Sequence, residues 1–199
     1  GILPMGTAND LADNLNIPKG LSEAAEIIAT GHTRRIDVCQ MNQRYFLNNS
    51  GVGLETAVSV QQTQMKRTRG ITRYLLATLI TIMRNPQWHM ELAWDEGQYQ
   101  GDVTLVSVGN NPRTGGIFYT VPNADPFDGK LSFVYGTIKK RFEILKVLPQ
   151  TMKPVEGNYI EHPAVNEIHS TWLRIRTTPS TPVHTDGEVI EEAINELEY

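Results

Sequence analysis

Cysteine, net positive charge and long apolar runs are all scarce in this chain of 199 residues. The single cysteine, Cys39, excludes an internal disulfide framework and a zinc site built from cysteines, and it fits a reducing compartment such as the cytosol. A net charge of -4 argues against nucleic-acid binding, because neutralising phosphates requires a basic surface. The longest apolar stretch, around residues 74–83, is much shorter than the roughly 20 residues that cross a bilayer.

The residues that are present predict a globular, mainly β protein with some helices. Hydrophobic residues make up 40% of the chain, and its length suffices for one sizeable core or a core plus part of another. Alternating segments typical of strands occur at residues 34–39, 44–48, 89–94, 99–108, 130–138 and 171–177. Helical spacing occurs at residues 10–17, 22–29, 75–83 and 142–148. We place a domain boundary near His32, where a helical start gives way to a β body of roughly 160 residues.

The first residues predict a chain that begins inside a folded unit. Ile2 and Leu3 have the character of the end of a buried strand, and residues 4–9 have that of a turn before a helix. The first residue is Gly1 rather than Met. We therefore expect a fragment of a longer protein.

Three short segments have residue types that suit phosphate or metal chemistry, and each also has a purely structural interpretation. In the first, "GTAND" at residues 6–10, Gly6 permits close backbone approach, Thr7 and Asn9 supply hydrogen bonds, and a helix N-terminus favours anions. A bound phosphate is one interpretation. A turn with a helix cap at Asn9 or Asp10 is the other.

The second segment is "PNADPFDG" at residues 122–129. Asp125 and Asp128 lie three residues apart before Gly129, and their carboxylates could ligate Mg²⁺ or Ca²⁺ together with backbone carbonyls. The alternative is a β-turn between strands, since Pro, Asp and Gly are common turn residues.

The third segment is "TDGE" at residues 185–188. Asp186 and Glu188 flank a glycine, so that one carboxylate could act as a base while the other orients a metal-water cluster. The alternative is a hairpin turn at Asp-Gly with an exposed glutamate.

In their order along the chain, these segments resemble the diacylglycerol kinase, sphingosine kinase and bacterial lipid kinase superfamily. The resemblance is strongest to bacterial proteins of the diacylglycerol kinase catalytic-domain type, and it covers nearly the whole chain. The stretches that carry it are "GILPMGTANDLADNLNIP", "YFLNNSGVGLETAV", "GITRYLL", "VSVGNNPRTGGIFYTVPNADPFDGKLSF" and "HTDGE". Each stretch is short, and their order and spacing make the resemblance specific.

The resemblance implies a two-lobe lipid kinase, with an α/β nucleotide lobe that carries a Gly-Gly-Asp-Gly-Thr loop and a C-terminal β-sandwich lobe that holds the lipid. That loop is absent from this chain and would precede Gly1. The fold expected is therefore mainly β with α: a remnant of the nucleotide lobe at residues 1–32 and the β-sandwich lipid-binding lobe at residues 33–199.

The same resemblance implies roles for individual residues. Four residues of the first segment would face the phosphates of ATP, namely Gly6, Thr7, Asn9 and Asp10. Asp10 would also join the Mg²⁺ and water network. Asp186 would be the base that takes the proton from a lipid hydroxyl, and Glu188 would support the metal network. Asp125 and Asp128 match the acids of a structural Mg²⁺ site that some bacterial members carry.

A lipid acceptor requires a long apolar cavity. Six residues could line it or could belong to the core: Leu47, Val52, Leu54, Val58, Leu75 and Leu79. Two basic clusters could contact anionic head groups or could form a solvated surface: Lys66, Arg67, Arg69 and Arg73, and residues 139–141. Three histidines are interpreted as structural or surface residues: His162, His169 and His184.

The function expected from the resemblance is ATP-dependent transfer of the γ-phosphate to the hydroxyl of diacylglycerol, a sphingoid base or a related lipid. The enzyme would be cytoplasmic with peripheral membrane contact. The resemblance is compatible with a homodimer. We expect the fragment alone to be inactive, because the nucleotide loop is missing. The alternatives are a non-catalytic lipid-binding or regulatory module of the same fold and, less favoured, a relative of NAD kinases.

Overall fold

The computed structural model describes residues 1–65, 70–84 and 86–199, and most of its regular structure is β. Its strands are β1 (Cys39–Met41), β2 (Arg44–Phe46), β3 (Asn49–Gly53), β4 (Trp88–Trp94), β5 (Gly97–Val103), β6 (Leu105–Gly109), β7 (Leu131–Gly136), β8 (Val165–Ser170), β9 (Leu173–Thr185) and β10 (Glu188–Glu198). Its helices are α1 (Asp10–Asn14), α2 (Leu21–Ala29), α3 (Leu54–Gln64), α4 (Gly70–Arg84), α5 (Arg141–Val147) and the 3₁₀ turns η1 (Leu148–Met152) and η2 (Tyr159–Glu161).

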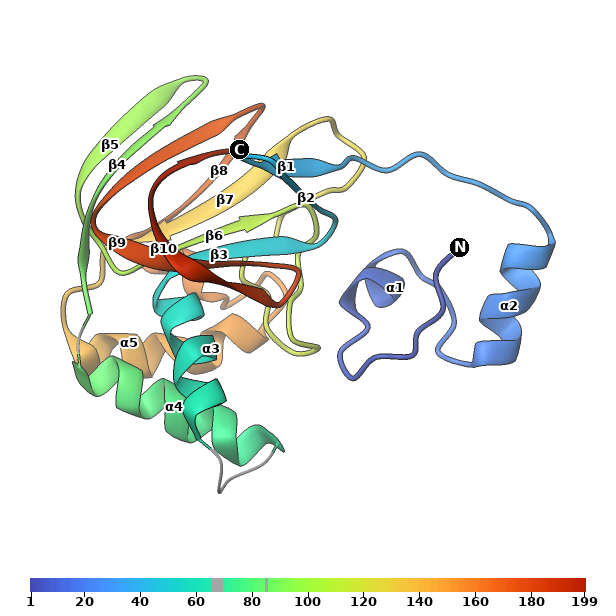
Figure 1. Ribbon diagram of the computed structural model, residues 1–199, viewed down its shortest axis with the longest axis horizontal. Helices are drawn as coiled ribbons and strands as arrows, with labels where there is room; N and C mark the ends of the chain where they lie inside the picture. The colour runs from blue at the N-terminus through green and yellow to red at the C-terminus, as the bar shows by residue number, and fades with distance from the viewer. Residues whose placement is uncertain (66–69, 85) are drawn as a thin grey trace.

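One antiparallel sheet forms the body of the molecule, with the strand order β5-β4-β9-β3-β6-β7-β8 (Figure 1). Strand β10 pairs back along β9, and β1 and β2 form a separate hairpin. The sheet is curled, because strands that are distant in this order meet across the core. The Trp94 ring of β4 lies 5.6 Å from Phe133 of β7, and the Tyr99 ring of β5 lies 5.0 Å from Tyr135 of β7, measured between centroids. The two halves of the sheet therefore enclose a core as the layers of a β-sandwich do.

Strand β7 separates two cores, and its alternating side chains belong to one or the other. Phe133 and Tyr135 belong to the core inside the curled sheet, whereas Val134 packs with residues of the helical side, such as Ile82 and Ile144. All six residues of β7 and all five of β3 are buried. The centre of the sheet is thus covered on both faces. Its inner face packs on the core inside the curl, and its outer face packs against the helices.

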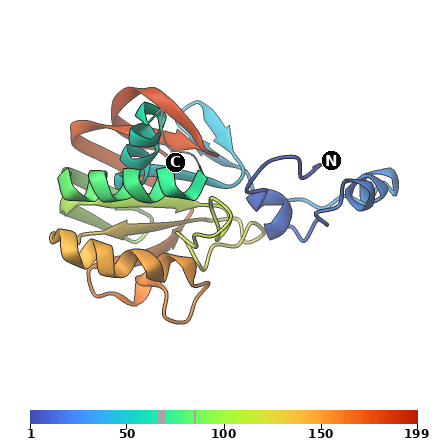
Figure 2. The same ribbon diagram turned by 90° about the horizontal axis from the view of Figure 1, so that it is seen from below.

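Helices α3, α4 and α5 cover that outer face, and α1 and α2 lie to one side of the body (Figures 1 and 2). The face of α4 that turns inward carries Ala77, Thr81 and Ile82, all buried. The threonine hydroxyl is satisfied within the helix, because Thr81 Oγ1 donates to the Ala77 carbonyl at 2.8 Å. Apart from the buried Ile82, five large apolar residues of α4 are exposed by 36–47%, and they are Leu75, Leu76, Leu79, Ile80 and Met83. The predicted apolar face of this helix therefore points outward.

Several predicted elements are confirmed and others are wrong. The strand predicted at residues 89–94 matches β4, that at 130–138 contains β7, and the helices at 22–29, 75–83 and 142–148 correspond to α2, α4 and α5. The strand predicted at 34–39 is wrong for residues 34–38, because Asp37 bonds to loops: its amide donates to the Pro126 carbonyl, and its carboxylate accepts from the Gly129 amide. The strand predicted at 99–108 is two strands, with Thr104 between them.

The expected strand end at Ile2 and Leu3 is also wrong, since residues 1–5 have no regular structure. Leu3 is exposed by 44%.

Pattern analysis missed α3, β3, β8 and β10 altogether. Across the described residues, no helix combines the length and the apolar character needed to span a bilayer.

Candidate functional site

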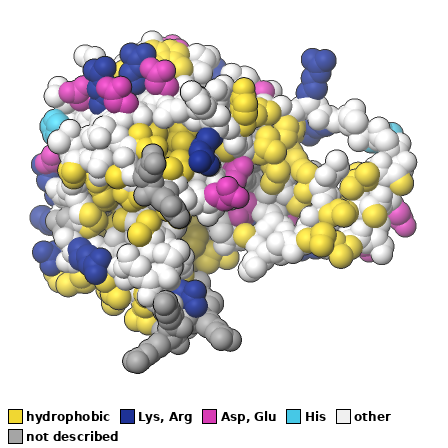
Figure 3. All heavy atoms as spheres, in the orientation of Figure 1, with side chains coloured by type: hydrophobic (Ala, Val, Ile, Leu, Met, Phe, Trp, Pro, Cys, Tyr) yellow, Lys and Arg dark blue, Asp and Glu magenta, His cyan; other side chains and the backbone are white. Residues whose placement is uncertain are grey.

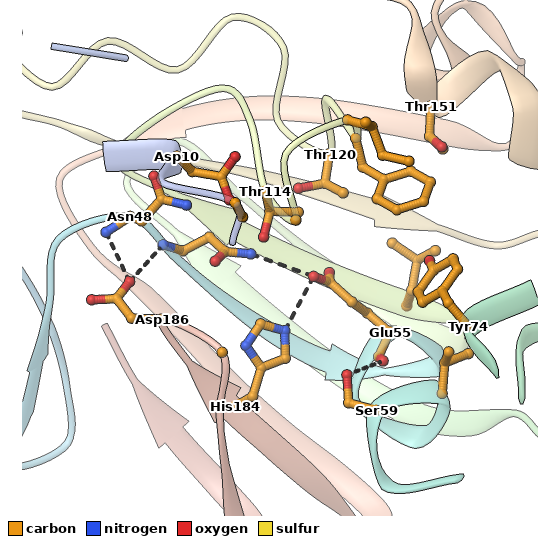
Figure 4. Close-up of a pocket in the computed structure, with 18 of the residues that line it drawn as sticks. Asp10, Asn48, Glu55, Ser59, Tyr74, Thr114, Thr120, Thr151, His184 and Asp186 are labelled. Carbon is orange, nitrogen blue, oxygen red and sulfur yellow. Dashed lines mark hydrogen bonds and ion pairs between the residues drawn. The ribbon is translucent and has the colours of Figure 1, made fainter. Parts of the chain in front are cut away.

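A cavity of about 970 Å³ is lined by the outer face of the sheet, helices α3 to α5 and the N-terminal segment. One end is apolar, and its lining includes Val58, Tyr74, Ile82, Phe118, Ile144 and Val147. The other end is polar, and its lining includes Asp10, Asn48, Asn49, Glu55, His184 and Asp186 (Figure 4). Acidic side chains also lie at the edge of the body that faces the N-terminal segment (Figure 3). The site therefore joins a polar rim to an apolar chamber.

Asp186 is held at this rim by the turn that connects β9 to β10. Asp186 has φ 48° and Gly187 has φ 85°, and Thr185 pairs with Glu188 beyond them, so the predicted hairpin turn is present. The Asp186 carboxylate accepts three backbone hydrogen bonds, from Leu47 at 2.9 Å, Asn48 at 2.8 Å and Asn49 at 3.0 Å. These donors fix the carboxylate where β3 begins, facing the cavity. Glu188 is exposed and is not part of the cavity lining.

Asp10 lies at the same rim and is held by the loop that follows β6. Its Oδ1 accepts from Arg113 Nε at 3.2 Å and from the Gly116 amide at 2.9 Å. Arg113 also donates to Asp13 through Nη2, and this hydrogen bond lowers the pKa of the Asp13 carboxyl. The side chains of Arg113, Asp10 and Asp13 are only 10–17% exposed. The interactions of Arg113 with Asp10 and Asp13 therefore hold α1 against the body. They leave Asp10 Oδ2 without a partner among the described residues.

The "GTAND" segment forms a compact turn whose members line the cavity, including Gly6, Thr7, Asn9 and Asp10. Asn9 occupies the N-cap position of α1 with φ 54°, but its side chain makes no capping bond. Instead the Gly6 amide donates to Asn9 Oδ1 at 2.8 Å, and Asn9 Nδ2 donates to the Gly6 carbonyl at 2.9 Å. The structure thus has the turn but not the helix cap that the structural interpretation predicted.

The carboxylates of Asp125 and Asp128 accept hydrogen bonds from backbone amides of their own turn. Asp125 Oδ1 accepts from the Phe127 amide at 3.0 Å, and Asp128 Oδ1 accepts from the Lys130 amide at 2.9 Å. Neither residue lines the cavity. Within the described ranges, no group of three or more His, Cys, Asp or Glu side chains is arranged to hold a metal ion. The turn that the sequence offered as the alternative is present, and the structural Mg²⁺ site stays a prediction.

Sequence reasoning missed the pair formed by Glu55 and His184. Glu55 begins α3, and His184 lies on β9 opposite Gly51 of β3. His184 Nε2 lies 3.1 Å from Glu55 Oε1, and the two side chains are 6% and 21% exposed. His184 Nδ1 is buried without a hydrogen-bond partner in the part of the chain that the structure describes. Only the register of β3 and β9 brings these residues together, so no local sequence signal indicates the pair.

The other sequence-based assignments divide between the cavity and the rest of the molecule. Three of the six candidate lining residues do line the cavity, namely Leu47, Leu54 and Val58. Val52 belongs to the core inside the sheet, and Leu75 and Leu79 are exposed. Both other histidines are structural: His169 Nδ1 bonds with Ser132 Oγ at 2.6 Å, and His162 Nδ1 accepts from the Ala164 amide at 3.1 Å.

Of the two basic clusters, the one at residues 139–141 lies outside the cavity lining. Lys66, Arg67 and Arg69 lie outside the described residues. Lys139 Nζ is 3.8 Å from Asp102, and Lys140 Nζ is 3.6 Å from Glu143, with both lysine side chains more than 70% exposed. Both lysines are therefore on an exposed surface, and contact of this cluster with anionic head groups stays a prediction.

Comparison with known proteins agrees with this architecture. The family described as "YegS C-terminal NAD kinase beta sandwich-like domain" matches residues 49–198, and the one described as "Diacylglycerol kinase catalytic domain" matches residues 1–41. Because the first match covers more than half of the chain, the chain belongs to the family of YegS C-terminal NAD kinase beta sandwich-like domains, and its first residues are similar to the diacylglycerol kinase catalytic domain. The curled antiparallel sheet is accordingly the C-terminal β-sandwich lobe of that family, as predicted.

Individual lipid kinase relatives resemble the chain over nearly all of its length. A protein from Staphylococcus haemolyticus named "Putative lipid kinase" is 31% identical over 192 residues, which cover 95% of this chain and 61% of that protein. A crystal structure of a "putative diacylglycerol kinase" from Bacillus anthracis superposes with a TM-score of 0.74 at 26% identity, covering 97% of this chain and 62% of the other. The chain thus spans about three fifths of the length of these relatives.

Proposed function

We propose that the full-length protein is an ATP-dependent lipid kinase and that this chain supplies its acceptor site. The observation that carries the proposal is a single cavity that has Asp10 and Asp186 at one end and apolar side chains at the other. Its volume of about 970 Å³ is at the upper end of the range for small-molecule sites. A lipid would place its acyl chain among residues such as Val58, Ile82 and Ile144, and its hydroxyl toward the two aspartates.

At the polar end, the chemistry requires positioning and charge neutralisation rather than covalent help from the protein. We assign the phosphates of ATP to the turn formed by residues 6–10, which closes the cavity on the side of the N-terminal segment. Asp10 Oδ2 is an oxygen ligand of the kind that Mg²⁺ prefers, and Arg113 and Gly116 hold this side chain by its other oxygen. Bound Mg²⁺ would neutralise the phosphates. In this proposal residues 1–32 are the remnant of the nucleotide lobe and residues 33–199 the lipid lobe.

Asp186 is our candidate for the group that orients the lipid hydroxyl and accepts its proton, with Glu188 supporting the metal network. The support for Asp186 is its placement at the rim by three backbone amides. Each carboxylate oxygen accepts at least one of these bonds, so the geometry is fixed while acceptor capacity remains. Asp125 and Asp128 are kept as candidates for a structural Mg²⁺ site.

The outward face of α4 supports peripheral membrane contact. The same helix lines the cavity with Tyr74, Thr78 and Ile82 and presents exposed leucines on its other side. An amphipathic helix of this kind can lie in the interface of a bilayer. We propose that α4 contacts the membrane from which the acceptor lipid enters the cavity.

The test is transfer of labelled γ-phosphate from ATP by the full-length protein to a panel of lipids that includes diacylglycerols, monoacylglycerols and sphingoid bases, with NAD in a parallel reaction. We expect a labelled lipid, no labelled NAD, and no transfer by the 199-residue chain alone. Lipid binding without transfer would favour a non-catalytic lipid-binding module, and labelling of NAD would contradict the lipid assignment.

Within the same assay, Asp186→Asn should lower kcat by at least about 100-fold, because an amide is a poor proton acceptor. Asparagine tolerates the positive φ of this turn and keeps one acceptor oxygen for the backbone amides. Thermal unfolding of the variant separates a loss of chemistry from a loss of structure. A variant that folds and retains its kcat would remove Asp186 from the proposed role.

A further inference from the structure

Residues 1–32 are joined to the rest of the chain by polar contacts rather than by a shared core. Neither hydrophobic cluster of the body includes any of them. Among the described residues, every hydrogen bond that crosses from this segment to residues 33–199 involves Asp10, Asp13 or Asn14 of α1. A polar joint of this kind permits one unit to move against the other. The position of α1 therefore depends on a few side chains.

Arg113, in the loop after β6, is the main partner of α1. Its Nε donates to Asp10 Oδ1 at 3.2 Å, and its Nη2 donates to Asp13. The guanidinium group thus bridges two carboxylates that lie one turn apart on the helix. The Arg113 side chain is 17% exposed, so these ion pairs are largely removed from water. A single side chain of the body therefore sets both the place and the rotation of α1.

The Arg113 loop also determines which oxygen of Asp10 stays available. Arg113 Nε and the Gly116 amide both donate to Oδ1, which leaves Oδ2 without a partner in the part of the chain that the structure describes. Asp10 lines the cavity, whereas Arg113 does not. Arg113 can therefore act on the site only through the carboxylate that it holds.

The same loop is connected to Asp186 through Asn48. The Asn48 backbone amide donates to Asp186 Oδ1 at 2.8 Å, and its side-chain Nδ2 donates to the Arg113 carbonyl at 3.0 Å. The Asn48 Oδ1 atom accepts from Asn14 Nδ2 of α1 at 3.3 Å. Figure 4 shows Asn48 between Asp186 and the helix that carries Asp10. The two aspartates at the rim are thus linked by a continuous set of contacts, although they belong to opposite ends of the chain.

We propose that Arg113 is a positioning residue that holds α1 on the β-sandwich lobe and keeps Asp10 in register with Asp186. The inference rests on the proposed kinase function, in which these aspartates serve the phosphates and the lipid hydroxyl. Phosphoryl transfer depends on the alignment of the two reacting groups, and small displacements are costly. Arginine suits this role better than lysine, because its planar fork reaches two carboxylates at once. Loss of Arg113 leaves the lipid cavity intact and misaligns the nucleotide side of the site.

Arg113→Gln in the full-length protein removes the charge and the fork and keeps a polar side chain. For the lipid of the panel that the wild type phosphorylates fastest, we expect kcat to fall at least about tenfold. The Kd of the same lipid, measured without nucleotide by displacement of a fluorescent fatty acid, should stay within about threefold of the wild type, because Arg113 does not line the cavity. A wild-type kcat in this variant would overturn the inference.

Two further variants show that the fork geometry matters. Arg113→Lys keeps the charge but replaces the fork by one ammonium group, and it should restore only part of kcat. The matched control is Arg174→Gln, because Arg174 donates to Glu198 through both Nε and Nη2 at 2.9 Å on an exposed surface of β9 and β10. This control should keep the wild-type kcat. The same loss of kcat in both glutamine variants would contradict a specific role of Arg113.

Hydrogen–deuterium exchange without nucleotide or metal tests the contact itself. In Arg113→Gln, the amides of α1 should exchange at least about threefold faster, while β3, β7 and α5 keep their wild-type rates. Unchanged exchange at α1 would overturn the inference. Faster exchange throughout the β-sandwich lobe would overturn it as well, because Arg113 would then stabilise the whole fold rather than the joint.

The exchange and turnover measurements separate this inference from the kinase proposal. Faster exchange confined to α1, in a protein that transfers no phosphate to any lipid, would support the role of Arg113 and contradict the kinase proposal. Phosphate transfer by the wild type, with exchange and turnover unchanged in Arg113→Gln, would have the opposite meaning.

Discussion

Gly51 leaves the space that the His184–Glu55 pair occupies. A Cβ atom at this position would lie 2.4 Å from His184 Nε2 and 2.9 Å from Glu55 Cδ, both closer than Cβ atoms in proteins approach other atoms. The identity of a residue on β3 therefore decides the geometry of two residues from other elements. Both Glu55 and His184 lie in stretches that carry the family resemblance, but their pairing could not be predicted from sequence, because it depends on the register of β3 and β9.

Gly51→Ala should separate the pair and destabilise the protein by about 1–3 kcal/mol, since an added methyl group forces packed side chains to move. The free energy of unfolding from urea titrations of the full-length protein measures the effect. Gly136→Ala is the matched control on β7, because its Cβ would meet nothing closer than 3.7 Å and should be tolerated better. Equal stability losses in the two variants would contradict the geometry given for Gly51.

Helix α4 shows what periodicity can and cannot predict at the scale of an element. Its helical spacing predicted its existence, and the structure confirms it. The direction of its apolar face was not predictable, because Tyr74, Thr78 and Ile82 face the cavity while the leucines are exposed. Strand β3 was missed by pattern analysis for a different reason. It is buried on both faces and reads "NSGVG", so alternation gives no signal.

Replacing Leu76 and Leu79 with serine should weaken binding of the full-length protein to lipid vesicles by at least about tenfold, because two leucine side chains no longer enter the interface. The fold should be retained, since both residues are about 40% exposed. Vesicle sedimentation measures the affinity. Tyr45→Ser is the control, as Tyr45 is 71% exposed on the β1–β2 hairpin, on the side of the molecule away from α4 (Figure 1). The same loss in the control, or none in the double variant, would contradict membrane contact through α4.

Across the whole molecule, the cavity is assembled from segments that are far apart in the chain. Its polar rim combines the turn at residues 6–10, the start of β3 and the β9–β10 turn, and its apolar end adds α4 and α5. The order of short motifs was enough to predict the β-sandwich lobe and to indicate Asp10 and Asp186 as candidates, and the structure brings both to one cavity. Local patterns could not show that the cavity exists, because no single segment contains it.

The central claim is that the acceptor lipid occupies this cavity, with its acyl chain among α3, α4 and α5. The most direct measurement is photolabelling of the full-length protein with a lipid that carries a diazirine in its acyl chain, followed by mass spectrometry of the labelled peptides. We predict labels on cavity residues such as Val58, Ile82 and Ile144, and competition by unlabelled lipid. Labels confined to the outward residues of α4, such as Leu75 and Leu79, would contradict the claim.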